Sequence, residues 1–203
     1  MHYPHQFCTG VARLLGWRTV RRVVASFLLL VSLSAAGVEL NSSSEYQVKA
    51  AFLFNFAKYI DWPAEAMGDA SQPFNICFVG DKSISQDLQQ VVSGKSIANH
   101  SIRIIQVHAP GDSHVCHILF VASSSSALEA LYIARLGESS VLTVGEKPGF
   151  CRRGGIINFW MDADHVRFEM SPKAAQRAHL RPSSKLLSLA RLVEGPSDSG
   201  GSQ

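Results

Sequence analysis

The residues best suited to hold a metal ion lie in one short part of the chain. His114, Cys116 and His117 fall within four positions, and His100 and His108 precede them. Imidazole and thiolate groups are the ligands that zinc and copper prefer. If Cys116 begins a strand, its side chain and that of His117 point to opposite faces, and a disulfide-bonded Cys116 is no ligand. Hydrogen-bonded or exposed loop histidines are the alternative to a metal site, and we expect no metal here.

Cys151 has the sequence neighbours of a reactive thiol, because Arg152 and Arg153 follow it directly. Guanidinium groups lower the pKa of a nearby thiol, and the thiolate is the reactive form. The sequence positions no histidine to serve as the base. Cys151 is therefore either the nucleophile of a thiol-dependent enzyme or an ordinary cysteine in a loop, and the two readings differ in the pKa that they require.

Other motifs lack the partners that their chemistry requires. Residues 94–96 (Gly-Lys-Ser) resemble the end of a phosphate-binding loop, but Gln89 stands where that loop needs a further glycine. Asp162 and Asp164 have the spacing of a hairpin turn, where Asp is favoured for backbone reasons. The chain has neither Gly-x-Ser-x-Gly nor Ser-x-x-Lys. We therefore expect no catalytic site and no cofactor, and the chain is predicted not to be an enzyme.

The elements that position these residues alternate between helices and strands. Helical spacing of apolar residues predicts a helix at 46–60, with Ser44 as its N-cap and an end before Pro63. Strands are expected at 74–80, 101–107, 116–122, 140–144, 156–160 and 166–170, and further helices at 84–92, 127–135, 172–178 and 183–193. The last two strands form a hairpin. The class is α/β: a single compact domain at 45–193, with a mixed sheet of about five strands flanked by helices.

Aromatic side chains gather in the helix at 46–60 and in the segment 150–160. Most of them are expected in the core. Trp62 stands beside the helix-ending Pro63, and its amphipathic ring suits a surface groove or a contact. The candidate interaction surface consists of Tyr59, Trp62, Phe150 and Trp160.

The first 36 residues have the pattern of an export signal. Four Arg and no acid occur there, an apolar run occupies 23–33, and small residues follow at 34–36. That run is too short to span a membrane, which takes about 20 residues. Residues 1–36 are predicted to be a signal peptide cleaved near Ala36, which leaves a periplasmic chain with no membrane insertion. An uncleaved anchor or a buried helix is the alternative.

Removal of the signal changes the charge and the cysteine count. The whole chain has 19 basic and 16 acidic residues, whereas 15 basic residues remain after position 36, together with all 16 acids. A nucleic-acid binder would keep a basic stripe, so this class is excluded. Cys77, Cys116 and Cys151 remain in an oxidising compartment, which fits one disulfide and one leftover thiol. Residues 194–203 form a Gly/Ser-rich tail that we expect to be disordered.

Several segments together resemble the YfiR family of periplasmic proteins. They are the helix and its exit at 46–63, the strand at 76–80, Gly-Gly-Ile-Ile-Asn-Phe at 154–159, Val-Arg-Phe-Glu at 166–169 and Ser-Ser-Lys-Leu-Leu at 183–187. The resemblance implies an exported, non-enzymatic inhibitor. Its partner would be the periplasmic sensor domain of an inner-membrane diguanylate cyclase or a similar receptor, so that binding lowers cyclic-di-GMP signalling and limits biofilm formation. It also implies a homodimer.

The resemblance further implies a disulfide between Cys77 and Cys116. A second bridge of the family would begin at Cys151, but the chain has Asn158 where a partner is needed, and no Cys further on. Cys151 is therefore expected to be an unpaired thiol. The alternative function is a periplasmic module that binds a small ligand or a metal through the stretch from His100 to His117.

Overall fold

The computed structural model describes residues 36–80, 82–122 and 126–195 of the chain. Residues 1–35 of the predicted signal peptide and 196–203 of the predicted tail lie outside this range. The chain divides into two units, Met1–Ser42 and Ser43–Gln203, and the second contains the whole sheet. Within the described residues, no helix combines the length and the apolar character needed to cross a membrane.

The described elements alternate along the chain, as expected for the α/β class. The helices are α2 (Ala36–Tyr59), α3 (Ala64–Met67), α4 (Ser83–Val92), α5 (Ser126–Leu136), α6 (Pro172–Arg177) and α7 (Ser184–Leu189), with 3-10 turns η1 (Pro110–Val115) and η2 (Cys151–Arg153). The strands are β1 (Ile60–Asp61), β2 (Phe74–Val79), β3 (Ser96–Ile97), β4 (His100–Gln106), β5 (Ile118–Val121), β6 (Leu142–Gly145), β7 (Ile157–Asp162), β8 (His165–Met170), β9 (Arg181–Pro182) and β10 (Arg191–Leu192).

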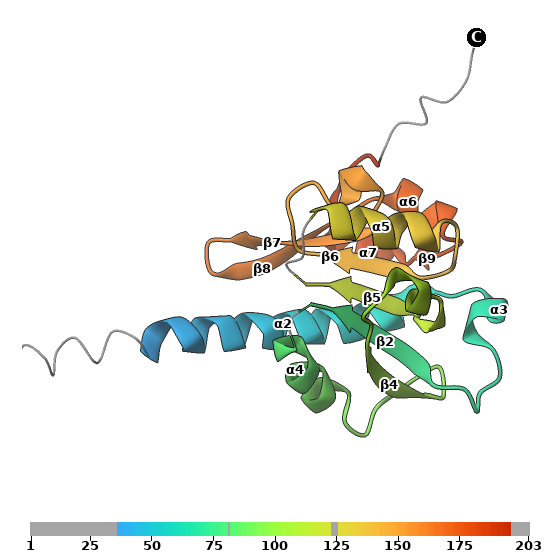
Figure 1. The fold of residues 1–203 in the computed structure, drawn as a ribbon, viewed down its shortest axis with the longest axis horizontal. Helices are drawn as coiled ribbons and strands as arrows, with labels where there is room; N and C mark the ends of the chain where they lie inside the picture. Colours follow the sequence, from blue (N-terminus) through green and yellow to red (C-terminus); the bar gives the residue numbers. More distant parts are fainter. Residues whose placement is uncertain (1–35, 81, 123–125, 196–203) are drawn as a thin grey trace, which may run out of the picture. The chain divides into compact units, whose positions relative to one another are not determined.

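Within the described residues the main sheet has eight strands, more than the five or so expected from the sequence. Their order is β10-β8-β7-β6-β5-β2-β4-β3. Strands β4, β2, β5, β6 and β7 run parallel, whereas β8 is antiparallel to β7 and β3 to β4. The sheet is therefore mixed, as the hairpin predicted (Figure 1). A separate two-stranded sheet pairs β1 with β9, so that Ile60 faces Pro182.

Two helix boundaries differ from those expected by more than one residue. Helix α2 begins at Ala36, which places Ser44 inside the helix and not at its N-cap. The last helix ends at Leu189 instead of continuing to Val193, because Arg191 and Leu192 pair with β8 as the edge strand β10. The cap at the start of this helix is the hydroxyl of Ser183, which accepts a hydrogen bond from the Leu186 amide.

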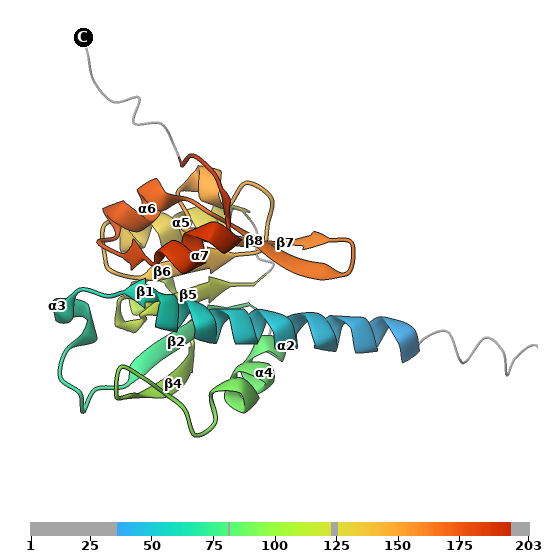
Figure 2. The ribbon, with the colours of Figure 1, turned by 180° about the vertical axis from the view of Figure 1, so that it is seen from behind.

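Alternating side chains of the central strands build two hydrophobic layers, because successive residues of a strand point to opposite faces. Ile118 and Phe120 of β5 join the larger layer with residues of α2, α4 and α7, whereas Leu119 and Val121 join a smaller one with residues of α5. The central strands are therefore buried on both faces, which explains their continuous apolar sequences. Figure 2, which views the molecule from behind, shows α2 and α7 in front of the sheet.

Phenylalanines join α2 to the β7–β8 hairpin. The ring of Phe56 lies 5.0 Å from that of Phe168 and 5.7 Å from that of Phe159, measured between centroids. Phe52 lies within 6 Å of both rings on the hairpin. Such pairs contribute about 0.5–1.5 kcal/mol each beyond their burial. They fix the end of α2, and with it the residues that follow.

Candidate functional site

Trp62 follows the end of α2 and lies half-buried at the surface. Its Nε1 donates a hydrogen bond to the carbonyl of Ala57, at 3.1 Å. The indole meets the ring of Phe74 edge to face, with 5.2 Å between centroids, and lies 6.0 Å from the ring of His117. These ring contacts and the hydrogen bond hold Trp62, so its exposed edge has a fixed position.

A groove opens beside this indole. It has a volume of about 430 Å³ and lies between the end of α2 and the turn that joins β3 to β4. Lys58 and Asp61 supply charges, and Ile97 and Ala98 supply the opposite wall. We call it the Trp62 groove. It combines a rigid aromatic ring with charged groups at the rim, which is the composition of a protein contact.

His117 supports Trp62 from beneath and is not a metal ligand in this arrangement. Its Nδ1 accepts a hydrogen bond from the Asn75 amide at 2.9 Å, and its Nε2 donates one to the Ala66 carbonyl at 3.0 Å. These partners fix the neutral tautomer that carries its proton on Nε2. Burial lowers the pKa of His117 below its ordinary value, and the nearby His100 lowers it further, against the opposing effect of the Ala66 hydrogen bond.

The other histidines of the metal hypothesis do not converge on His117. The ring of His100 hydrogen-bonds the Gln72 carbonyl through Nδ1, at 2.8 Å. His108 and His114 are exposed. Cys116 is bonded to Cys77, with 5.7 Å between the Cα atoms, which is the pairing that the resemblance implied. Among the described residues, no three His, Cys, Asp or Glu side chains are grouped to hold a metal.

Tyr59 lies at the end of α2 beside Lys185 of α7. The Lys185 ammonium lies 5.0 Å from the centre of the Tyr59 ring and donates a hydrogen bond to its hydroxyl, at 3.2 Å. The Ser183 amide also donates to the Tyr59 carbonyl, at 2.9 Å. These contacts connect the start of α7 to the chain that leads into Trp62.

Trp160 lies on the β7–β8 hairpin, apart from Tyr59 and Trp62. Figure 2 shows β1 at the left and the β7–β8 hairpin well apart from it at the right. The Arg191 guanidinium covers the Trp160 ring at 4.5 Å and also pairs with Glu169. Glu169 accepts a further hydrogen bond from Asn158, at 3.4 Å. The structure therefore does not bring the four residues of the candidate surface together.

Phe150 is not at the surface, which corrects its inclusion in the candidate interaction surface. Its exposed fraction is 0%. Its ring lies so close to Gly145 and Gly155 that a Cβ atom added to these glycines would approach it to 2.5 and 2.1 Å. The ring fits only because both positions lack a side chain. Phe150 is a core residue and cannot contact a partner in this state.

Cys151 does not have the properties of a reactive thiol. It is unpaired and fully buried, and its sulfur faces the carbonyl of Ile156 at 3.5 Å. Burial raises its pKa to about 12, and the negative charge of Glu169 adds to this effect. The nearby Arg153 and Arg191 lower the pKa too little to compensate. The sequence neighbours suggested a thiolate, but burial keeps the group protonated.

The structure shows buried ion pairs that sequence reasoning missed. Lys49 of α2 has an exposed fraction of 5% and pairs with Glu146, at 2.6 Å, and with Glu45. Glu129 has an exposed fraction of 0% and pairs with Arg153. A lysine among the apolar positions of α2 was the available signal for the first pair. Nothing in the local sequence predicts the second.

The phosphate-loop motif lies in a plain turn. Gly94 has a φ of 67°, and the Lys95 amide donates to the Val92 carbonyl as the chain turns from α4 into β3. The motif does not follow a strand and does not open a helix, as a phosphate-binding loop must.

Comparison with known proteins identifies a family that covers most of the chain. A family model described as YfiR/HmsC-like matches residues 46–191. Among solved structures, the chain is similar to a conserved domain protein from Vibrio cholerae, with 9% sequence identity and a TM-score of 0.45. That similarity covers 58% of this chain and 54% of the other, so it spans about half of that protein's length. The comparison with curated proteins found no match.

Proposed function

The chain belongs to the YfiR/HmsC-like family, whose members are periplasmic regulatory proteins, and we propose that it inhibits an inner-membrane diguanylate cyclase or a similar receptor. It would bind the periplasmic sensor domain of that receptor and lower cyclic-di-GMP signalling. The family match over residues 46–191 supports the proposal. It includes all the strands of the main sheet, apart from the last residue of β10, Leu192.

The proposed mechanism follows from binding linkage. An inhibitor lowers the output of a receptor only when it binds the inactive state more tightly than the active state. No chemical step is required of the inhibitor. A rigid contact surface with fixed aromatic side chains meets this requirement, because it loses little conformational entropy on binding.

We place the receptor contact at the Trp62 groove, with Tyr59 beside it. The indole of Trp62 is held by Phe74 and the Ala57 carbonyl, so its exposed edge is preorganised. Lys58 is exposed at the rim of the groove, where a charge can select its partner. Trp160 on the hairpin is a second, separate contact in this proposal.

The decisive experiment removes the gene and measures cyclic-di-GMP and surface attachment. Both should rise, and the mature protein should co-purify with a membrane protein that carries a diguanylate cyclase domain. Unchanged cyclic-di-GMP in the deletion strain, after the parent strain is shown to contain the protein, would contradict the proposal. Sedimentation of the purified protein tests the homodimer separately.

Variants of the groove locate the contact. Trp62→Ala should weaken receptor binding by about 2 kcal/mol or more if the indole is a hot spot, and urea unfolding checks that the fold persists. Lys58→Ala changes only an exposed rim residue and should slow association. Arg135→Ala, an exposed basic residue of α5, is the matched control. Equal binding by the groove variants and the control would place the contact elsewhere.

A further inference from the structure

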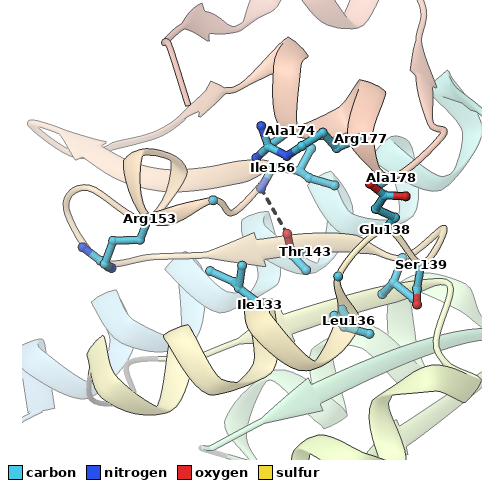
Figure 3. A pocket seen from close by; sticks show the side chains of 13 residues that line it. Ile133, Leu136, Glu138, Ser139, Thr143, Arg153, Ile156, Ala174, Arg177 and Ala178 are labelled. Atoms are coloured by element: carbon cyan, nitrogen blue, oxygen red, sulfur yellow. Dashed lines mark hydrogen bonds between the residues drawn. The ribbon is translucent and has the colours of Figure 1, made fainter. Parts of the chain in front are cut away.

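A second cavity lies between α5 and α6, away from the residues of the Trp62 groove. Its volume is about 390 Å³, which is within the range of pockets that hold small molecules. Thr143 of β6 and Ile156 lie between the two helices, and the Ile156 amide donates a hydrogen bond to the Thr143 hydroxyl at 3.0 Å (Figure 3). We call it the α5–α6 cavity.

Most of the side chains around the α5–α6 cavity are aliphatic. Ile133 and Leu136 project from α5 (Figure 3), and Ile156 and Val141, which directly precedes β6, also line the cavity. Leu136 and Val141 belong to the smaller hydrophobic layer, so their positions are fixed by the core. A ligand in this cavity would therefore bury an apolar body against preformed walls.

Arg177 of α6 brings a positive charge to this cavity, and no acidic side chain among the described residues pairs with it. Its guanidinium lies beside Ile156 (Figure 3). The Nη1 atom is shielded from water and has no hydrogen-bond partner. In the part of the chain that the structure describes, Arg177 forms no ion pair. A half-buried cation that lacks a partner is costly, and a bound anion would remove that cost.

The other charges near the cavity do not neutralise Arg177. Arg153 is paired with the buried Glu129 and donates a second hydrogen bond to the Pro148 carbonyl, at 2.9 Å. Figure 3 shows its side chain turned away from Arg177. Glu138 is exposed, and Figure 3 shows it on the side of the cavity away from Arg153; hydration weakens its interactions there. Among the described residues that line the cavity, Arg177 is thus the cation without a paired acidic group.

We propose that the α5–α6 cavity binds a small organic carboxylate with an apolar body. The carboxylate pairs with the guanidinium of Arg177, and the apolar body lies against Ile133, Leu136 and Val141. This proposal does not rest on the inhibitor function, because none of the residues of the Trp62 groove takes part.

Benzoate is a suitable probe, with benzyl alcohol as its uncharged counterpart and inorganic phosphate as an anion without an apolar body. Amide chemical shifts of the isotope-labelled mature protein report binding directly. Benzoate should cause saturable shifts at Gly137, Thr143 and Ala178, which line the cavity. Benzyl alcohol and phosphate should bind at least about tenfold more weakly, because each loses either the charged hydrogen bond or the apolar contact.

Two variants test the role of charge in the cavity. Arg177→Gln should weaken benzoate binding by about tenfold, since a hydrogen bond to a charged group is lost. Glu138→Gln removes a like charge at an exposed position and should leave benzoate binding equal or slightly tighter. Arg181→Gln is the matched control, because Arg181 is exposed on β9 and does not line the cavity.

The outcomes separate cleanly. No saturable shifts with benzoate would overturn the proposal, and so would equal binding by wild type and a folded Arg177→Gln variant. Tighter binding of phosphate than of benzoate would contradict the proposal that the ligand has an apolar body. If Arg177→Gln loses benzoate binding but still inhibits the receptor, the result supports this site and shows that it is separate from the inhibitor function.

Discussion

His117 is the residue through which acid would act on the Trp62 groove. Burial lowers its pKa below the ordinary value of 6.5, so the folded chain holds it neutral. As the pH falls through 6.5, the unfolded chain takes up a proton that the folded chain resists. The free energy of unfolding must therefore decrease as the pH falls below about 6.5.

The pH dependence gives a first prediction. Urea unfolding of the wild type should show a lower free energy of unfolding at pH 5.5 than at pH 7.5, and His117→Asn should reduce that difference. Asp69, whose pKa is lowered by its hydrogen bonds with Ser71, titrates at lower pH and remains in both proteins. An identical pH dependence in wild type and variant would show that His117 is not the responsible group.

The disulfide between Cys77 and Cys116 gives a second prediction. It closes a loop of 39 residues, for which the chain-entropy account expects about 4 kcal/mol of stabilisation. The double replacement Cys77→Ala, Cys116→Ala should lower the free energy of unfolding by about this amount, with some addition from lost core packing. Cys151→Ala is the control that keeps the bridge. A loss equal in both variants would mean that packing and not the bridge stabilises the fold.

Cys151 gives a third prediction, because a buried thiol with a pKa of about 12 has almost no thiolate near neutral pH. A thiol-reactive dye at pH 8 should leave the native chain unmodified and should label one cysteine after unfolding in urea. Fast labelling of the native chain would contradict the burial of Cys151, and would reopen its reading as a nucleophile.

At the level of elements, hydrophobic pattern predicted the parts that pack against much of the core. The helix after position 46 was expected from apolar spacing, the buried strands from apolar runs, and the hairpin from the turn residues Asp162 and Asp164. The short strand β3 was not expected, although it pairs with the adjacent β4 across a two-residue turn. The strands β1, β9 and β10 were not expected either, because each pairs through two residues whose register depends on distant backbone. For the same reason the last helix was expected to be too long.

The candidate site divides in the same way. The position of Trp62 beside a groove was expected from the Pro that follows it. The burial of Phe150 was not, since it depends on glycines at 145 and 155 that approach only after folding. Arg177 gave no signal in the sequence, because an arginine near a helix end is ordinarily a solvated residue.

The turn between β3 and β4 gives a prediction at this scale. Ala98 and Asn99 are its two central residues, and both have positive φ, of 46° and 70°. Ala is strained there, whereas Asn tolerates this region and is favoured in such turns. Ala98→Asn should raise the free energy of unfolding by about 0.5–1 kcal/mol. Ala134→Asn, at an exposed site inside α5, should lower it, and a loss in both would contradict the strain.

For the molecule as a whole, membership of the YfiR/HmsC-like family supports a periplasmic regulatory role. The prediction at this scale concerns export. The mature protein recovered from the periplasm should begin near Gly37, because residues 1–36 have the pattern of a signal peptide. Mass spectrometry of the intact chain measures this directly. A chain that retains residues 1–36, or that is found in the cytoplasm, would contradict export.

The close packing of Phe150 against Gly145 and Gly155 also constrains which substitutions this sequence can accept. A side chain at Gly155 or Gly145 would collide with that ring, so neither glycine can be exchanged alone. A larger residue at 145 or 155 therefore becomes possible only after a smaller residue has replaced Phe150. Aligned descendants of this gene should therefore show these three sites changing as a set while their neighbours drift independently.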